Sequence, residues 1–133
     1  AWSSQLLIGF KIQLLNLQTG ELRTVGTSGG ACRPAFSPDT REMAFVHLDA
    51  EPSQLEAVTA SGRRTLIADP RLWAYYPAYS PDGRYIAFSV SPEHHAGEDW
   101  DLAVTDARPG AITKLTSGPG NDRVPDWRPT RPR

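Results

Sequence analysis

The chain has 133 residues, of which 39% are hydrophobic and 22% are charged, and its formal net charge is -1. This length suffices for one compact domain and is short for two, and the composition is that of a globular chain rather than a disordered or a nucleic-acid-binding one. An apolar run of about 18 residues, which a membrane-spanning helix requires, is missing, and the single cysteine, Cys32, excludes an intrachain disulfide and a cysteine-pair metal site.

The first 30 residues carry three short strand signals. Apolar and β-branched residues dominate 6–10, 12–17 and 22–25, and Gly20 places a turn before the last of these segments. We expect three strands here, which correspond to the second, third and fourth strands of the repeat described next.

A sequence string recurs in the rest of the chain. PAFSPDTREMAF at residues 34–45 matches PAYSPDGRYIAF at residues 77–88, and PDWRP at residues 125–129 starts a third copy. A second pattern, a set of turns at Gly20, Gly62 and Gly110, recurs in step with these strings. Two patterns that recur in step indicate a tandem repeat.

Each complete repeat, at about residues 31–73 and 74–121, predicts four short strands. SPDG at residues 80–83 forms a tight turn, because proline presets φ and glycine accepts the left-handed conformation. Thr40 replaces this glycine in the first repeat, so that hairpin must be strained or use another turn. In the first repeat we expect strands at 43–48, 55–59 and 65–68. In the second repeat we expect strands at 77–79, 85–90, 101–105 and 112–115.

The fold class is predicted to be all-β, because no segment has a helical period. Segment 43–46 (MAFV) is apolar on both faces, which suits a sheet covered on both sides, as the blades of a β-propeller are. A sandwich or meander whose hairpins are alike by accident is the alternative. We expect four-stranded blades, about three per chain, of which two are complete. The third is split between the two ends of the chain: residues 1–30 supply its second to fourth strands, and the segment 122–133 supplies a first strand at 124–127.

These residues resemble a known family. The string at 77–88, the turn at Gly110 and the spacing of apolar, acidic, proline and tryptophan residues over 115–127 are similar to the repeat of TolB-like propellers, relatives of the WD-repeat propellers. Thr40 and Arg128 depart from that repeat. The resemblance implies a periplasmic or cell-envelope location, with a cytoplasmic one left open, and a partner such as a peptidoglycan-associated lipoprotein.

Three blades are too few to close a ring, since propellers need about four to eight. Uncovered blade faces and an unpaired strand edge favour association. We therefore predict a homodimer of six blades in which the strand at 124–127 completes the partner's split blade. The competing explanation is that the sequence, which begins with Ala1 and lacks an initiating methionine, is cut from a longer propeller chain or processed.

The predicted binding surface is the face where the loops 27–33, 69–76, 93–99 and 117–123 gather around the channel. These loops are rich in the aromatic and guanidinium groups that are enriched at protein interfaces. Trp73 and Tyr76 could instead pack only between blades. The candidate binding residues are Arg33, Arg71, Trp73, Tyr75, Tyr76, His94, His95 and Arg123.

No motif for catalysis is present, because the nucleophile elbow, the phosphate-binding glycine loop and the metalloprotease helix are all missing. Asp39 and Asp82 recur at equal repeat positions, which we interpret as turn capping rather than acid–base chemistry. His94 and His95 could ligate a metal with nearby carboxylates, but their spacing matches no metal motif, so we predict a solvated loop.

The sequence thus predicts a non-catalytic protein- or peptide-binding propeller module without a cofactor or a metal. Two alternatives stay open: the propeller portion of a hydrolase or lyase, and a half-propeller that assembles without a specific ligand. A nucleophile elbow in a longer native chain would favour the hydrolase.

Overall fold

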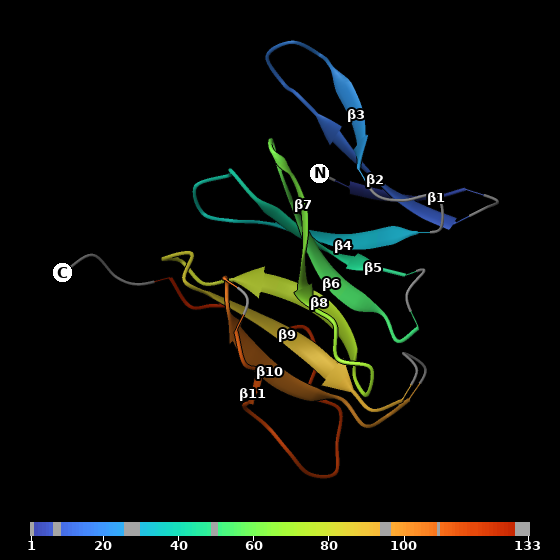
Figure 1. Ribbon diagram of the computed structural model, residues 1–133, viewed down its shortest axis with the longest axis vertical. Coiled ribbons are helices and arrows are strands. Elements are labelled where there is room, and N and C mark those ends of the chain that lie inside the picture. Colours follow the sequence, from blue (N-terminus) through green and yellow to red (C-terminus); the bar gives the residue numbers. More distant parts are fainter. Residues whose placement is uncertain are drawn as a thin grey trace.

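The computed structural model describes residues 2–6, 9–25, 30–48, 51–93, 97–108 and 110–129, and within these ranges the chain forms strands and no helix. Three antiparallel sheets follow one another and stack side by side (Figure 1). Sheet A contains β1 (Trp2–Leu6), β2 (Gly9–Leu15) and β3 (Leu22–Val25). Sheet B contains β4 (Ala31–Phe36), β5 (Met43–His47), β6 (Gln54–Thr59) and β7 (Gly62–Ile67). Sheet C contains β8 (Trp73–Tyr79), β9 (Tyr85–Ser91), β10 (Asp101–Asp106) and β11 (Thr113–Lys114).

The strands of sheets B and C lie in sequence order, each paired with the next. This is the meander of a propeller blade, so the all-β class and the four-stranded blades predicted from the sequence are confirmed. Sheet A has three strands. None of the described segments forms a helix that could cross a bilayer.

A boundary in sheet A differs from the prediction. The residue pattern predicts strands at 6–10 and 12–17 with a break at Lys11, whereas β1 ends at Leu6 and β2 runs from Gly9 to Leu15. Lys11 pairs with Ser4 of β1. Lys11 stands between Phe10 and Ile12 in an alternation of apolar and polar residues, which is the period of a strand with one buried face. The lysine is therefore a strand residue on the more polar face and not a strand boundary.

β5 joins the neighbouring sheets because both of its faces are buried. Met43 and Phe45 pack against sheet A, whereas Ala44 and Val46 belong to the larger cluster between sheets B and C. None of the four is more than 2% exposed. This confirms that the second strand of the repeat is covered on both sides. Sheet A contributes Ile12 and Val25 to the first cluster, and sheet C contributes Ile86, Phe88, Val90, Trp100 and Ala103, among others, to the second.

Residues 122–129 are placed against sheet C, and the strand predicted at 124–127 pairs with none of the described strands. The N–H of Val124 donates to Ser89 Oγ at 3.1 Å, and Trp127 Nε1 donates to the carbonyl of Ala78 at 2.9 Å. The segment makes side-chain bonds instead of a ladder because no second strand of a following blade lies beside it among these residues.

The two tight turns are capped by equivalent aspartates. Asp39 Oδ1 accepts a hydrogen bond from the Ser37 hydroxyl at 2.7 Å, and Asp82 Oδ1 accepts one from Ser80 at 2.6 Å. These hydroxyl bonds are the main reason why the pKa of both carboxyl groups is lowered. The same oxygens accept hydrogen bonds from the backbone N–H groups of Arg41 and Arg84, both at 3.1 Å. The turn-capping interpretation is therefore confirmed for both aspartates.

A polar network closes the junction between sheets B and C. The Arg64 guanidinium donates to both carboxylate oxygens of Glu42, at 3.0 and 2.7 Å, and to the carbonyl of Ala107 at 2.6 Å. The Tyr79 hydroxyl donates to the same carboxylate. Burial and this carboxylate raise the pKa of Tyr79 above its usual range, so the phenol stays protonated and keeps its donor role.

We predict that Thr40→Gly stabilises the protein. Thr40 has a φ of 58° at the turn position where Gly83 has 70°, so the strained alternative considered above is the one adopted. Relief of left-handed strain at a β-branched residue, less the entropy of a new glycine, gives an expected gain of about 1 kcal/mol in the free energy of unfolding. Urea denaturation measures it. The matched change Gly83→Thr should destabilise, and a lower midpoint for Thr40→Gly would contradict the strain.

We predict that Glu42→Gln destabilises the chain by about 2 kcal/mol, because it leaves the partly buried Arg64 without its carboxylate. Arg64 Nη1 already lacks a partner, so the neutral Ala107 carbonyl would be the guanidinium's remaining full-strength acceptor among the described residues. Tyr79→Phe removes one donor and leaves the ion pair, so it should cost less. Chemical denaturation of both variants ranks them, and an equal or larger loss for Tyr79→Phe would show that the ion pair is not the main component.

Candidate functional site

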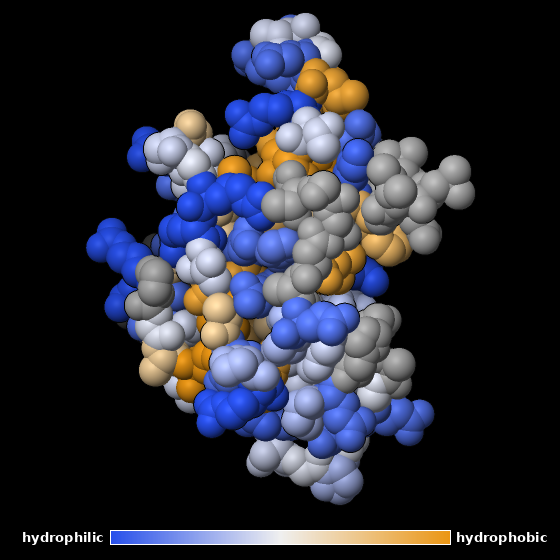
Figure 2. Space-filling view, turned by 45° about the vertical axis from the view of Figure 1, so that its right-hand side comes forward, coloured by the Kyte–Doolittle hydropathy of each residue, from blue (hydrophilic) through white to orange (hydrophobic). Residues whose placement is uncertain are grey.

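A pocket of about 320 Å3 lies on the side of the molecule where β5 and β9 end and β4 and β8 begin, at the right of Figure 1. Figure 2 turns this side toward the viewer and shows apolar side chains in the gaps between hydrophilic ones. Residues from all three sheets and from the segment after β11 line it. We call it the Arg33–Arg123 pocket; its lining is Phe10, Cys32, Arg33, Leu48, Tyr75, Tyr76, Trp100 and Arg123.

Two residues of the pocket occupy a kink that repeats between blades. Arg33 and Tyr76 each precede the proline of their repeat and have positive φ, 55° and 56°. The pairing register of β4 and β8 shifts at these points, as in a β-bulge. A bulge re-aims the side chain of the strand that carries it. Val124, the residue before the third proline, has a φ of 57°, so the kink is a property of the repeat.

Guanidinium groups lie on aromatic rings in this pocket. The Arg33 guanidinium is 4.7 Å from the centroid of the Tyr76 ring, and the Arg123 guanidinium is 5.8 Å from that of Trp100. Tyr75 meets Trp100 edge to face, with centroids 5.5 Å apart. Both stacking distances are in the range of cation–π contacts, which hold an arginine in place without consuming its N–H groups.

The pocket offers binding groups and no activated nucleophile. Burial raises the pKa of the Cys32 thiol to about 11, so the sulfur is protonated at neutral pH. Burial likewise raises the pKa of Tyr75. Trp100 is 1% exposed and its Nε1 donates to the carbonyl of Gly97 at 3.0 Å, which fixes the ring as part of the pocket wall.

Four of the predicted binding residues come together in this pocket: Arg33, Tyr75, Tyr76 and Arg123. Arg71 does not line it, and its guanidinium pairs with Asp69 at 2.8 Å. The hydrogen bonds from Arg71 lower the pKa of Asp69 to about 2. Trp73 and Tyr76, the two residues for which packing between blades was the alternative, both pack against the core between sheets B and C, and Tyr76 also lines the pocket. His94 and His95 lie outside the described residues.

The sequence analysis did not single out four other lining residues, Phe10, Cys32, Leu48 and Trp100. One signal was available: Cys32 and Tyr75 stand at the same repeat position, two residues before the proline. Phe10, Leu48 and Trp100 become neighbours only through the stacking of sheets, which no local pattern reveals.

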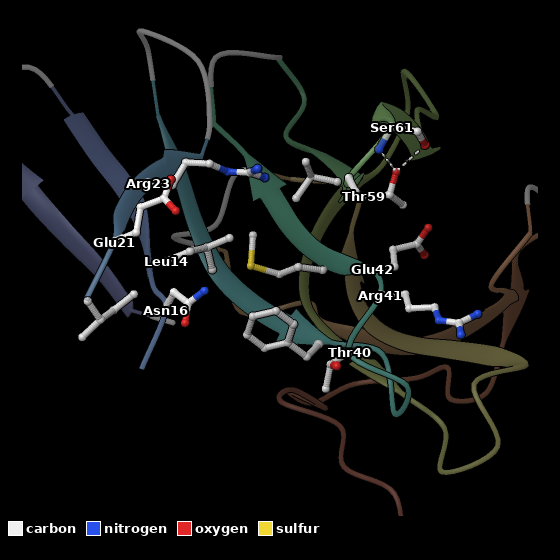
Figure 3. Close-up of a pocket in the computed structure, with 14 residues that line it drawn as sticks. Leu14, Asn16, Glu21, Arg23, Thr40, Arg41, Glu42, Thr59 and Ser61 are labelled. Atoms are coloured by element: carbon white, nitrogen blue, oxygen red, sulfur yellow. Dashed lines mark hydrogen bonds between the residues drawn. The ribbon is translucent and has the colours of Figure 1, made fainter. Parts of the chain in front are cut away.

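A larger hollow of about 910 Å3 lies between sheets A and B near the tight turns, away from the pocket (Figure 3). Leu14, Asn16, Glu21 and Arg23 border it from sheet A, and Thr40, Arg41, Glu42, Thr59 and Ser61 border it from sheet B. Phe36 lines it and is 44% exposed, whereas Tyr79, at the same repeat position, bonds to Glu42 in the next junction. The corresponding space between sheets B and C is therefore smaller, about 380 Å3.

The described residues contain no group of three or more histidine, cysteine, aspartate or glutamate side chains that could hold a metal ion. The carboxylates with described partners serve structure: Glu56 binds Arg63 and accepts a bond from His47, and Asp101 pairs with Lys114.

Comparison with known proteins points to one family. No family model matches the chain. Over 94 residues, 71% of this chain, it is 36% identical to the Tol-Pal system protein TolB of Anaeromyxobacter dehalogenans. The match spans 21% of that relative, so the chain covers about a fifth of the length of the curated relatives.

Solved structures agree with this result. A putative TolB from Agrobacterium tumefaciens superposes with a TM-score of 0.74 at 20% identity, over 89% of this chain and 46% of that structure. TolB from Acinetobacter baumannii gives 0.69 at 19% identity, over 85% and 28%. A prolyl endopeptidase gives 0.61 at 15% identity, over 84% and 19%, which shows likeness of fold alone. With its repeat strings, its four-stranded blades and these relatives, the chain is a TolB-like β-propeller segment.

Proposed function

We propose that this chain is a non-catalytic module that binds a protein or peptide at the Arg33–Arg123 pocket. The observation that carries the proposal is the pair of kinked residues, Arg33 and Tyr76, which present a guanidinium and an aromatic ring from adjacent blades. The kink belongs to the repeat, whereas the residue at the kink differs from blade to blade. Variable side chains on a constant backbone feature are what a recognition surface requires.

The partner and the location follow from the family. The curated relatives are named as Tol-Pal system proteins, so we infer a periplasmic or cell-envelope location and a peptidoglycan-associated lipoprotein as the partner. The pocket is suited to a protein segment because aromatic and arginine side chains, which are enriched at protein interfaces, make up most of its lining. The protonated Cys32 thiol supports a binding role over a catalytic one.

Replacement of Tyr76 by alanine tests this function. The purified peptidoglycan-associated lipoprotein of Anaeromyxobacter dehalogenans is titrated into the chain by calorimetry. Tyr76→Ala should weaken binding at least about tenfold, since aromatic anchors at an interface contribute most of the affinity. Tyr85→Ala removes a half-buried ring near the tight turns and should leave the affinity unchanged. Equal effects of the two changes would place the interface elsewhere.

We also propose that sheet A receives a fourth strand from a second copy of the chain. Sheet A has the turn pattern of the second to fourth strands of a blade, and β1 pairs only with β2 among the described strands. The segment 121–127 has the first-strand kink, at Val124, without a second strand to pair with. Two copies would supply six blades, completing each split blade between chains.

Light scattering coupled to size-exclusion chromatography tests the paired assembly. A dimer mass at micromolar concentration is expected, and Trp127→Ala should shift the population toward monomer, because it removes the ring that anchors the first-strand segment to the Ala78 carbonyl. A stable monomer of the unmodified chain would contradict the assembly and leave the binding proposal standing.

A further inference from the structure

The polar groups of the Arg33–Arg123 pocket all favour a negative ligand. Two of its lining residues are arginines, and none is an acid. In the part of the chain that the structure describes, neither guanidinium forms an ion pair. Three arginines outside the pocket are neutralised, Arg63 by Glu56, Arg64 by Glu42 and Arg71 by Asp69. Exposed arginines such as Arg41 and Arg84 form no described ion pair either, so what sets Arg33 and Arg123 apart is that both line one pocket and stack on its aromatic rings.

These two guanidiniums are positioned in advance. Arg33 lies on Tyr76, with Nη2 also 3.4 Å from the phenol oxygen, and Arg123 lies on Trp100. Stacking restricts the arginine side chain while its N–H edge stays available to an incoming acceptor. A planar carboxylate matches that edge because its two oxygens can accept parallel hydrogen bonds. Less side-chain freedom is then lost on binding.

The rest of the lining is apolar or aromatic. Tyr75 and Trp100 form a rigid edge-to-face wall, and Phe10 is 37% exposed beside them. The volume of about 320 Å3 is at the small end of ligand sites, which begin at about 300 Å3. It suits one or two side chains rather than a long segment. A carboxylate next to an aromatic or aliphatic side chain would satisfy both halves of the pocket.

We propose that the Arg33–Arg123 pocket recognises an acidic residue that neighbours an apolar residue in an extended peptide of the partner protein. This inference rests on the proposed binding function and specifies its ligand. The carboxylate is bound by the guanidiniums, and the apolar neighbour packs on Phe10, the exposed apolar ring of the lining.

Two capped peptides test the inference, each N-acetylated and C-amidated. One contains a glutamate next to a phenylalanine, and the other has glutamine in place of the glutamate. By calorimetry the glutamate peptide should bind about tenfold more tightly, because a carboxylate accepts charge-assisted hydrogen bonds that an amide does not. Its advantage should shrink as salt rises from about 0.1 to about 1 M, since screening shortens the reach of exposed charges.

Matched arginine variants assign the effect to the pocket. Arg33→Gln and Arg123→Gln should each abolish most of the preference for the glutamate peptide and leave the weaker glutamine peptide unaffected. Arg71→Gln is the control, because that arginine is exposed and already paired with Asp69. Circular dichroism verifies that the three variants fold alike. An equal loss with Arg71→Gln would overturn the assignment.

Failure of this inference can be told from failure of the proposed function. If both peptides bind equally, the carboxylate preference is wrong, while lipoprotein binding that depends on Tyr76 would still support the module's role. If the lipoprotein does not bind but the glutamate peptide does, with the arginine dependence above, the ligand chemistry stands and the partner is wrong.

Discussion

The structure depends on one constraint: the second strand of each blade is apolar on both faces and must be covered from both sides. In sheet B, Met43 and Phe45 are covered by sheet A, and Ala44 and Val46 are covered from the side of sheet C. A blade that buries both faces of a strand cannot be stable alone, because about 25 cal/mol is lost for each Å2 of apolar surface returned to water. Stacking is thus a condition of folding for each sheet, and it brings residues of different blades into one pocket.

The polar interactions refine this stacking. Glu42, Arg64 and Tyr79 bridge sheets B and C at one end of their junction, and the Arg33–Tyr76 contact bridges them at the other. The first set is enclosed and satisfies its own charge. The second leaves a positive group open to a ligand. One blade junction therefore combines a structural end with an end suited to recognition.

Much of the fold could be predicted from the sequence because equivalent strings in the two repeats mark equivalent turns and strands. The strings at 34–45 and 77–88 locate the tight turns and the second strands, and both turns have equivalent hydrogen bonds. Lys11 was misjudged because a charged residue in a short strand resembles a break until its pairing with Ser4 is known.

The site could be predicted only in part. The repeat predicts that the segments of Arg33, Tyr76 and Arg123 gather, but Arg33 and Tyr76 stand in β4 and β8 and not in the expected loops. The left-handed conformation before each proline is not predicted either, since residues in that position normally favour extended backbone. Trp100 was not predicted as a pocket wall because it lies just before β10, far in sequence from Tyr75 of β8, and no local pattern shows that the two rings meet. Arg71 shows the opposite error, a binding-type residue whose charge is used locally.

The attachment of Trp127 to Ala78 bears on how such a chain can grow. Trp127 stands at the repeat position of Tyr79, and its ring nitrogen bonds to the backbone of the preceding blade without any further strand being present. The start of this repeat is therefore attached to the blade before it, as Tyr79 attaches sheet C to Glu42 of sheet B. A chain of this kind can lengthen by whole repeats, because neighbouring blades hold each junction. The number of blades in the final ring would then depend on the angle between neighbouring blades, summed over the junctions, and not on the structure of a single repeat.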